Sequence, residues 1–373
     1  MMKKVFFAAA LSALMLALSA VSWAQSSYYV LTNDDNSTTT NTASVFNLNT
    51  TNGKLSLVKT LETGGTTFQG GYYGGFAQAI SPGAACIFIA DGGTPDIAAF
   101  SKATHYSKVG NYTNPELQGG TNMPMIENSQ GTLLYAAYES SFNIGVWTIN
   151  PDCSLTIANI YAAPDFMGSM VITHDGGTLL ATYEIIKKVG SWTISGTTLT
   201  NNGTVKAIAN VSSIAVTNDD QVVIMGTAYN NAHPSQIVTA SLPGFTNQTS
   251  WTVGPGYSAG SIALTAPAAA GSGCLYIGNT GDGSSGTAGI TGATFTENPL
   301  NLTYVNNVTS TLPTYIGTIS TITNQGNGAG IYAAETEGYI GVYAANSECA
   351  VKLVQESADP NSTFLISLSG WVE

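Results

Sequence analysis

The chain has 373 residues and a formal net charge of −12, and its ten basic residues are all lysine. Because phosphate binding depends on clustered Lys and Arg, this composition argues against nucleic acid or an anionic membrane as a partner. Only 9% of the residues are charged and 41 are glycine, which is typical of many short strands joined by tight turns and unlike a helical protein.

The first element in the chain is an export signal. Lys3 and Lys4 precede an apolar stretch over residues 5–21, and Ser22-Trp23-Ala24 ends it as a small-x-small cleavage site of bacterial type. A membrane anchor is the competing interpretation, but the stretch is short, and no other segment reaches the roughly 18 apolar residues of a spanning helix. We predict a signal peptide over residues 1–24 and a single mature domain over 25–373, secreted or periplasmic, with no membrane span.

The mature chain repeats one unit, which is clearest over residues 131–150. There, two runs rich in β-branched, aromatic and small apolar residues flank a polar connection at 139–142, the pattern of a β-hairpin. An apolar run ending in a polar turn precedes the hairpin and a further strand-like run follows it, so each unit has four strands, A to D. The B strands are expected at residues 28–33, 86–91, 133–138, 179–183, 222–227, 274–279 and 330–335.

Seven units at these spacings predict an all-β protein, a seven-bladed β-propeller of four-stranded antiparallel blades. The chain ends support a ring, because the mature N-terminus starts on a B strand and residues 364–369 form an A strand with no B strand after it. We expect this C-terminal strand to complete the N-terminal blade, which leaves no free sheet edge. A pair of β-sandwiches or a solenoid is the alternative, and neither requires the two ends to match.

The up-and-down strand order divides the connections between two faces. The A–B and C–D turns lie on one, here the turn face, and the B–C and D–A connections lie on the other, here the loop face. The longer connections, residues 34–41, 64–75, 228–234 and 281–286, all belong to the loop face. Since binding groups usually sit on long loops above a rigid scaffold, we expect a ligand site there.

Four cysteines in an exported chain predict two disulfides. Cys86 and Cys274 each open a B strand, whereas Cys153 and Cys349 each lie in the C–D turn of the following blade, on the same turn face. We predict the pairs Cys86–Cys153 and Cys274–Cys349, each stabilising the fold by up to about 4 kcal/mol. A metal site is the alternative, but no Cys-x-x-Cys or paired His accompanies the thiols, and we expect neither metal nor cofactor.

Acidic side chains recur where the B strands end on the loop face. The candidate ligand-binding residues are Asp34, Asp91, Glu139, Glu184, Asp282 and Glu335, with Tyr72 and Tyr73 from the glycine-rich loop as possible platforms for a sugar ring. Carboxylates crowded at an opening would favour a cation, a polyhydroxyl ligand or a raised pKa. Alternatively, each acid simply caps its B–C turn, and the tyrosines pack over the channel mouth.

Familiar catalytic motifs are weak in this chain. Residues 256–260 match G-x-S-x-G and residues 281–286 match G-x-G-x-x-G, but each lies between strands, where those motifs need a following helix. Among the histidines, only His233 lies on the loop face and could act as a base, whereas His105 and His174 are expected at the surface or in turns. The other catalytic candidates are Glu139 and Glu184, either of which could activate water.

Four segments carry a family resemblance: YYVLTND at 28–34, ASVFNLNTTNGKLSL at 43–57, AISPG at 79–83 and residues 134–149, which include NIGVW at 143–147. They resemble the lactonase-like seven-bladed propellers with YVTN-like repeats, which include 6-phosphogluconolactonase-type and muconate-cyclising enzymes. The resemblance spans residues 28–370 and implies a hydrolase that holds an anionic lactone with Arg and His beside acidic residues. This chain has no Arg for that role, and residues 25–373 carry eight basic against 22 acidic side chains.

Three functions fit these features. The sequence favours an exported binding or scaffold module that holds a small neutral ligand such as a saccharide, a cation or a surface protein on its acidic loop face. The alternative is a lactone hydrolase with altered active-site residues. A purely structural envelope protein is the third.

Overall fold

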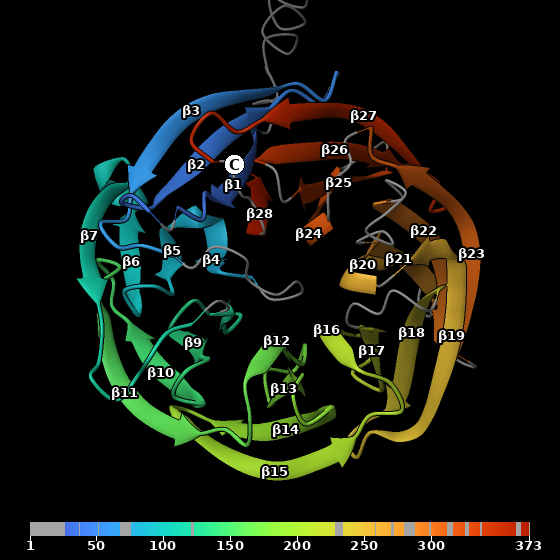
Figure 1. Ribbon diagram of the computed structural model, residues 1–373, viewed down its shortest axis with the longest axis horizontal. Coiled ribbons are helices and arrows are strands. Elements are labelled where there is room, and N and C mark those ends of the chain that lie inside the picture. Colours follow the sequence, from blue (N-terminus) through green and yellow to red (C-terminus); the bar gives the residue numbers. More distant parts are fainter. Residues whose placement is uncertain are drawn as a thin grey trace, which may run out of the picture.

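A computed structural model of the chain describes residues 27–372 except for 37, 51, 68–75, 121–122, 228–233, 258, 270–271, 280–287, 298–299, 312–315, 325–327, 336–337 and 363–366. The described strands form six sheets of four consecutive strands, and a further sheet in which the C-terminal strand joins the first three. The sheets are antiparallel and stand around a common centre, with one strand of each innermost (Figure 1). The chain is therefore an all-β propeller. The predicted signal peptide lies outside the described residues.

The blades, numbered by their order in the chain, have the following strands. Blade 1 holds β28 (Ser367–Val372), β1 (Tyr28–Asn33), β2 (Thr42–Leu48) and β3 (Leu55–Glu62); blade 2 holds β4 (Gln78–Ile80), β5 (Cys86–Asp91), β6 (Asp96–Ser101) and β7 (Ser107–Tyr112). Blade 3 holds β8 (Met125–Glu127), β9 (Leu133–Tyr138), β10 (Asn143–Ile149) and β11 (Leu155–Ala162); blade 4 holds β12 (Met167–Ile172), β13 (Thr178–Tyr183), β14 (Lys188–Ser195) and β15 (Thr198–Lys206).

The remaining blades follow the same plan. Blade 5 holds β16 (Val211–Val216), β17 (Val222–Thr227), β18 (Pro234–Ser241) and β19 (Thr246–Tyr257); blade 6 holds β20 (Ala259–Ala269), β21 (Ser272–Asn279), β22 (Gly289–Glu297) and β23 (Leu300–Thr309). Blade 7 holds β24 (Ile316–Asn324), β25 (Gly328–Glu335), β26 (Tyr339–Ala345) and β27 (Val351–Ala358). Two 3-10 turns, η1 (Pro82–Ala84) and η2 (Lys102–Thr104), flank β5 and β6.

The ring closes through the two ends of the chain. Strand β28 pairs with β1 in antiparallel register from Tyr28 opposite Val372 to Asn33 opposite Ser367. The Trp371 ring stacks on Tyr29, with their centroids 5.1 Å apart. The predicted closure is confirmed, although β28 is described only from Ser367 and runs to Val372, beyond the expected end at 369. Four B strands have the predicted bounds, and the other three begin one or two residues earlier.

The hydrophobic core lies mainly between neighbouring blades. Phe88 of β5 belongs to the same buried cluster as Tyr138 and Trp147 of blade 3. Alternate residues of the B and C strands face opposite sides of their sheet, so each blade buries apolar side chains against both neighbours. This packing fixes the positions of the strand ends on the two faces.

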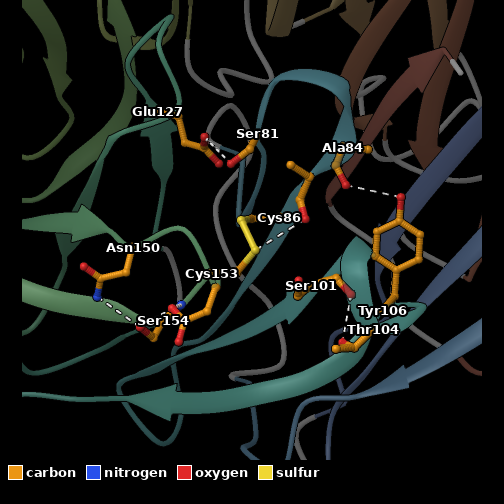
Figure 2. Close-up of a disulfide and its surroundings, with 12 residues drawn as sticks. Ser81, Ala84, Cys86, Ser101, Thr104, Tyr106, Glu127, Asn150, Cys153 and Ser154 are labelled. Atoms are coloured by element: carbon orange, nitrogen blue, oxygen red, sulfur yellow. Dashed lines mark hydrogen bonds between the residues drawn. A yellow bond between two sulfur atoms is a disulfide. The ribbon is translucent and has the colours of Figure 1, made fainter.

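Both predicted disulfides are present. The Cys86–Cys153 bond joins blades 2 and 3, and the Cys274–Cys349 bond joins blades 6 and 7, with Cα–Cα distances of 5.5 and 5.3 Å. Figure 2 shows the first, at the start of β5 near the hydrogen-bonded pair Ser81 and Glu127. Two disulfides point to a protein outside the cytoplasm, because cytosolic thiols are kept reduced. The described residues include no helix with the length and apolar character needed to cross a membrane.

Candidate functional site

The acids at the loop-face ends of the B strands do not share one position in the repeat. Asp91 is the last residue of β5 and pairs with the first residue of β6, Asp96. Tyr138 of β9 and Tyr183 of β13 occupy the same position as Asp91, because each is the last residue of its B strand and pairs with the first residue of the C strand. Glu139 and Glu184 come one residue later. Since successive side chains of a strand alternate between its faces, Asp91 belongs to a different layer from the two glutamates.

Asp34 is completely buried at the seam where blade 7 meets blade 1. Its carboxyl oxygens accept hydrogen bonds from Thr32 at 2.6 Å, Thr42 at 2.6 Å and Ser44 at 3.0 Å. Burial and the nearby charge of Asp359 raise the pKa of Asp34 to about 7. The single Thr32 hydroxyl proton also faces Asp359, at 2.9 Å, so a proton held between the two carboxyl groups completes the network. Asp34 therefore stabilises the ring closure.

Asp91 is also completely buried, between blades 1 and 2. Its Oδ1 accepts a hydrogen bond from the Asn41 amide at 2.7 Å, and Asn41 also donates to Asn33 at 2.7 Å. Burial raises the pKa of Asp91 to about 7. Because Asp34 and Asp91 lie inside the protein and are held by neighbouring polar groups, they match the turn-capping alternative better than an open ring of carboxylates.

Glu139 and Glu184 differ from these aspartates. Glu184 is 9% exposed, and its Oε1 is buried without a hydrogen-bond partner among the described residues. Burial, followed by the charges of Glu139 and Asp165, raises the pKa of Glu184 to about 8. Asp165 is held in place by the Ile186 backbone N–H, which donates to it at 2.9 Å. Three acidic side chains therefore meet between blades 3 and 4, and one keeps an open acceptor.

A β-bulge makes room for this group. Strand β12 departs from regular pairing with β13 between Met167 and Ser169, at Gly168. A Cβ atom on Gly168 would lie 2.2 Å from Oε1 of Glu184. Glycine therefore lets the carboxyl end of Glu184 approach the innermost strand, and β-bulges often occur beside binding sites.

Exposed apolar side chains stand beside the acids. Phe142 is 43% exposed and Ile185 is 67% exposed, each in the B–C turn that follows its glutamate. Phe142 has φ 53°, in the left-handed region, and its carbonyl accepts a hydrogen bond from Ala163 N–H. Gly338 has the equivalent role in blade 7, where φ is 75° and its carbonyl accepts from Asp359. Blade 3 thus holds a strained aromatic residue where glycine would fit without strain.

We refer to Glu139, Phe142, Asp165, Glu184 and Ile185 as the blade 3–4 site. The sequence singled out the two glutamates but missed the other three residues. Phe142 could have been found from the repeat, because its position matches Gly338 of blade 7. Asp165 gave no such signal, since its place depends on how the β11–β12 connection folds back.

Several other candidates can be placed less fully. Tyr72, Tyr73, His233 and Asp282 lie outside the described residues, as does the side chain of Glu335. His174 lies in the β12–β13 turn, as predicted, with Nδ1 2.9 Å from Asp220 of the next blade, and His105 is an exposed surface residue. In the part of the chain that the structure describes, no three His, Cys, Asp or Glu side chains are arranged to hold a metal ion.

The innermost strands surround an axial channel of about 560 Å³. Glu127, which the sequence reading overlooked, lines it from the end of β8. Asn128 makes the same A–B turn hydrogen bond as Ser81 and Thr173, so these three residues occupy equivalent positions in the repeat. The residue before each of them is also equivalent, and Glu127 therefore takes the position of Ile80 in β4 and Ile172 in β12. Glu127 could have been found from the sequence, because it is an acid at a position of the repeat that is otherwise apolar.

No protein-family model matches the sequence, and the comparison with curated proteins finds no match. Solved structures do match. A candidate 6-phosphogluconolactonase from Bacteroides fragilis aligns with a TM-score of 0.71 at 12% identity, covering 94% of this chain and 99% of that one. The fold is that of the lactonase-like β-propellers.

Two further structures agree. A candidate 6-phosphogluconolactonase from Bacteroides uniformis gives a TM-score of 0.70 at 12% identity, with 93% of this chain and 99% of that chain covered. The periplasmic gluconolactonase of Pseudomonas aeruginosa gives 0.66 at 13% identity, with 93% and 99% covered. At these identities the likeness establishes the architecture, and the activity has to be argued from this chain's own residues.

Proposed function

We propose that this chain is a seven-bladed propeller, secreted or periplasmic, that binds a neutral saccharide at the blade 3–4 site. The observation that carries the proposal is the buried, unpartnered Oε1 of Glu184 beside Glu139 and the exposed ring of Phe142. Carboxyl oxygens bond well to hydroxyl groups, and an aromatic face packs against the C–H face of a sugar ring. The strained backbone at Phe142 supports a role in binding, since such strain is retained where it serves a function.

The choice of a neutral ligand follows from charge. The chain carries a net charge of −12, and three acids meet at the site, so an anionic ligand would be repelled. A cation is less well supported, because the described acidic side chains form no group of metal-ligand geometry. The two disulfides support a place outside the cytoplasm.

The test is isothermal titration of the mature protein with neutral and acidic oligosaccharides. Glu184→Gln and Phe142→Gly should each weaken binding of a neutral saccharide by about tenfold. Glu348→Gln is the matched control, because Glu348 is exposed on the opposite, turn face. A folded protein that binds none of the sugars, or variants that bind them as tightly as the parent, would overturn the proposal.

Lactone hydrolysis is a second candidate, favoured by the pKa of Glu184, which burial raises to about 8. At neutral pH Glu184 holds a proton beside a second carboxyl group, a suitable acid–base pair. Glu139 would take a proton from water as the water oxygen bonds to the lactone carbonyl carbon. The ring C–O bond then breaks, and Glu184 gives its proton to the leaving oxygen, forming a hydroxy acid.

Proton release on a panel of neutral and anionic lactones tests this second candidate. Turnover that is lost in both Glu139→Gln and Glu184→Gln, but retained in Glu348→Gln, would establish it. If the protein binds sugars but hydrolyses none of the lactones, the binding function would stand and the hydrolase function would be rejected.

A further inference from the structure

The axial channel is a second candidate site, separate from the blade 3–4 site. Its volume of about 560 Å³ falls within the range of roughly 300–1,000 Å³ that is typical of small-molecule sites. The innermost strands contribute mainly aliphatic wall residues, such as Ile126, Ile214 and Ile262. A linear apolar ligand would therefore replace water against most of the wall.

Glu127 is the exception in this wall. Its Oε2 accepts a hydrogen bond from the Ser81 hydroxyl at 2.7 Å, as Figure 2 shows. Its Oε1 is buried and has no partner among the described residues. Burial raises the pKa of Glu127 to about 7. Buried polar atoms are nearly always hydrogen-bonded, so we expect Oε1 to accept a hydrogen bond from a donor that is not among the described residues.

Two other polar side chains of the wall, Gln78 and Asn128, are already hydrogen-bonded. Gln78 accepts a hydrogen bond from Ser367 and donates one to Ser369 at 3.2 Å. Asn128 donates to Thr132 at 2.9 Å, and its carbonyl oxygen accepts from the Thr132 backbone at 2.9 Å. Glu127 thus offers an open acceptor at the end of β8, where the channel approaches the turn face.

We propose that the channel binds a linear alkylamine, with the alkyl chain along the aliphatic wall and the ammonium group on Oε1 of Glu127. An ammonium group has donors and no acceptor, which matches a carboxyl oxygen that lacks a donor. Charge-assisted hydrogen bonds are also stronger than those between neutral groups. The net charge of −12 favours a cation over an anion of the same shape.

The test is isothermal titration of the mature protein with hexylamine, hexanol and hexanoate. We expect the amine to bind most tightly and hexanoate to show no binding. Glu127→Gln should lower the affinity for hexylamine by about tenfold and change the affinity for hexanol by no more than about twofold. Ala263→Leu narrows the channel and should weaken both. Glu348→Gln, which removes the same charge from the turn face, should change neither affinity.

Two results would overturn the proposal. One is equal binding of hexylamine to the parent and to Glu127→Gln. The other is amine binding that Ala263→Leu leaves unchanged, which would place the amine on the surface. If Glu127→Gln fails to fold, Ser81→Ala keeps the carboxyl group and releases Oε2, so amine binding should be retained or tightened; its loss would count against the site. Saccharide titrations of the same variants report separately on the blade 3–4 site.

Discussion

Asp34 and Glu184 directly follow β1 and β13, at the loop-face ends of the B strands of blades 1 and 4. Both are buried, and both have a raised pKa. Asp34 is surrounded by the hydroxyl groups of Thr32, Thr42 and Ser44. Glu184 faces two other acids and keeps one oxygen without a partner among the described residues. The hydrogen bonds of the first region are satisfied within the chain, whereas we propose that a ligand supplies the missing donor in the second.

The comparison teaches that burial alone does not mark a functional carboxyl group. A buried group whose hydrogen bonds are satisfied stabilises the fold. A buried group with an open acceptor instead carries an unfavourable desolvation free energy, which a ligand that donates a hydrogen bond can remove. On this criterion Asp34 belongs to the fold and Glu184 and Glu127 belong to the proposed sites, whereas Asp91 is intermediate, because its Oδ1 is hydrogen-bonded and its Oδ2 is buried without a partner among the described residues. The following predictions test that division, from the largest expected effect to the smallest.

The largest effect concerns pH. The pKa values of Asp34, Asp91 and Glu127 are raised to about 7 and that of Glu184 to about 8. The folded protein therefore binds more protons than the unfolded chain between about pH 4 and 8, so its stability falls as the pH rises through this range. The total change should be on the order of several kcal/mol. Urea unfolding from pH 4 to 8 measures it.

Two variants show how much of this pH dependence of stability comes from Asp34 and how much from Glu184. Asp34→Asn should remove part of the slope below about pH 7, and Glu184→Gln should remove the part that extends to about pH 8. Stability that is constant or increases from pH 5 to 7.5 would contradict the assigned protonation of all four groups.

The next effect comes from removing each acid. Asp34→Ala removes the acceptor that the hydroxyl groups of Thr32, Thr42 and Ser44 share and should lower the free energy of unfolding by about 3 kcal/mol. Glu184→Gln replaces a carboxyl group that already holds its proton at pH 6 with a neutral amide of similar shape, so stability should change by less than about 1 kcal/mol. Urea unfolding at pH 6 compares the two, and Asp34→Asn, which keeps the shape, is the control. Equal losses would mean that both carboxyl groups are structural.

Two glycines give a smaller test of the same contrast. A Cβ atom on Gly65 would lie 2.6 Å from Cβ of Asp91, whereas one on Gly168 would meet the flexible end of Glu184. Gly65→Ala should therefore cost about 2 kcal/mol, and Gly168→Ala less than about 1 kcal/mol. Thermal unfolding measures both. Gly168→Ala should in addition displace the Glu184 carboxyl group and weaken saccharide binding, while Gly65→Ala should leave that binding intact.

The repeat explains how far sequence could lead. Strand spacing, the matching chain ends and the positions of Cys86 and Cys153 determine the ring and its cross-links, because each depends on local pattern and on a fixed strand order. The state of each acid depends instead on which side chains the folded chain brings against it. Asp34 and Glu184 look alike in the sequence, yet the first meets hydroxyl groups and the second meets Asp165. These contacts form only in the folded chain, and sequence spacing does not encode them.

The smallest effect isolates Phe142, whose backbone lies in the left-handed region at φ 53°. Glycine adopts this conformation without strain, whereas alanine retains the strain after the ring is removed. Phe142→Gly should therefore be more stable than Phe142→Ala by about 1 kcal/mol, the reverse of the usual order in ordered backbone. Both variants should lose saccharide affinity to the same extent, because both lack the ring. Thermal unfolding and titration separate the two effects, and a Phe142→Ala protein more stable than Phe142→Gly would show that the turn is unstrained and that Phe142 is held by packing alone.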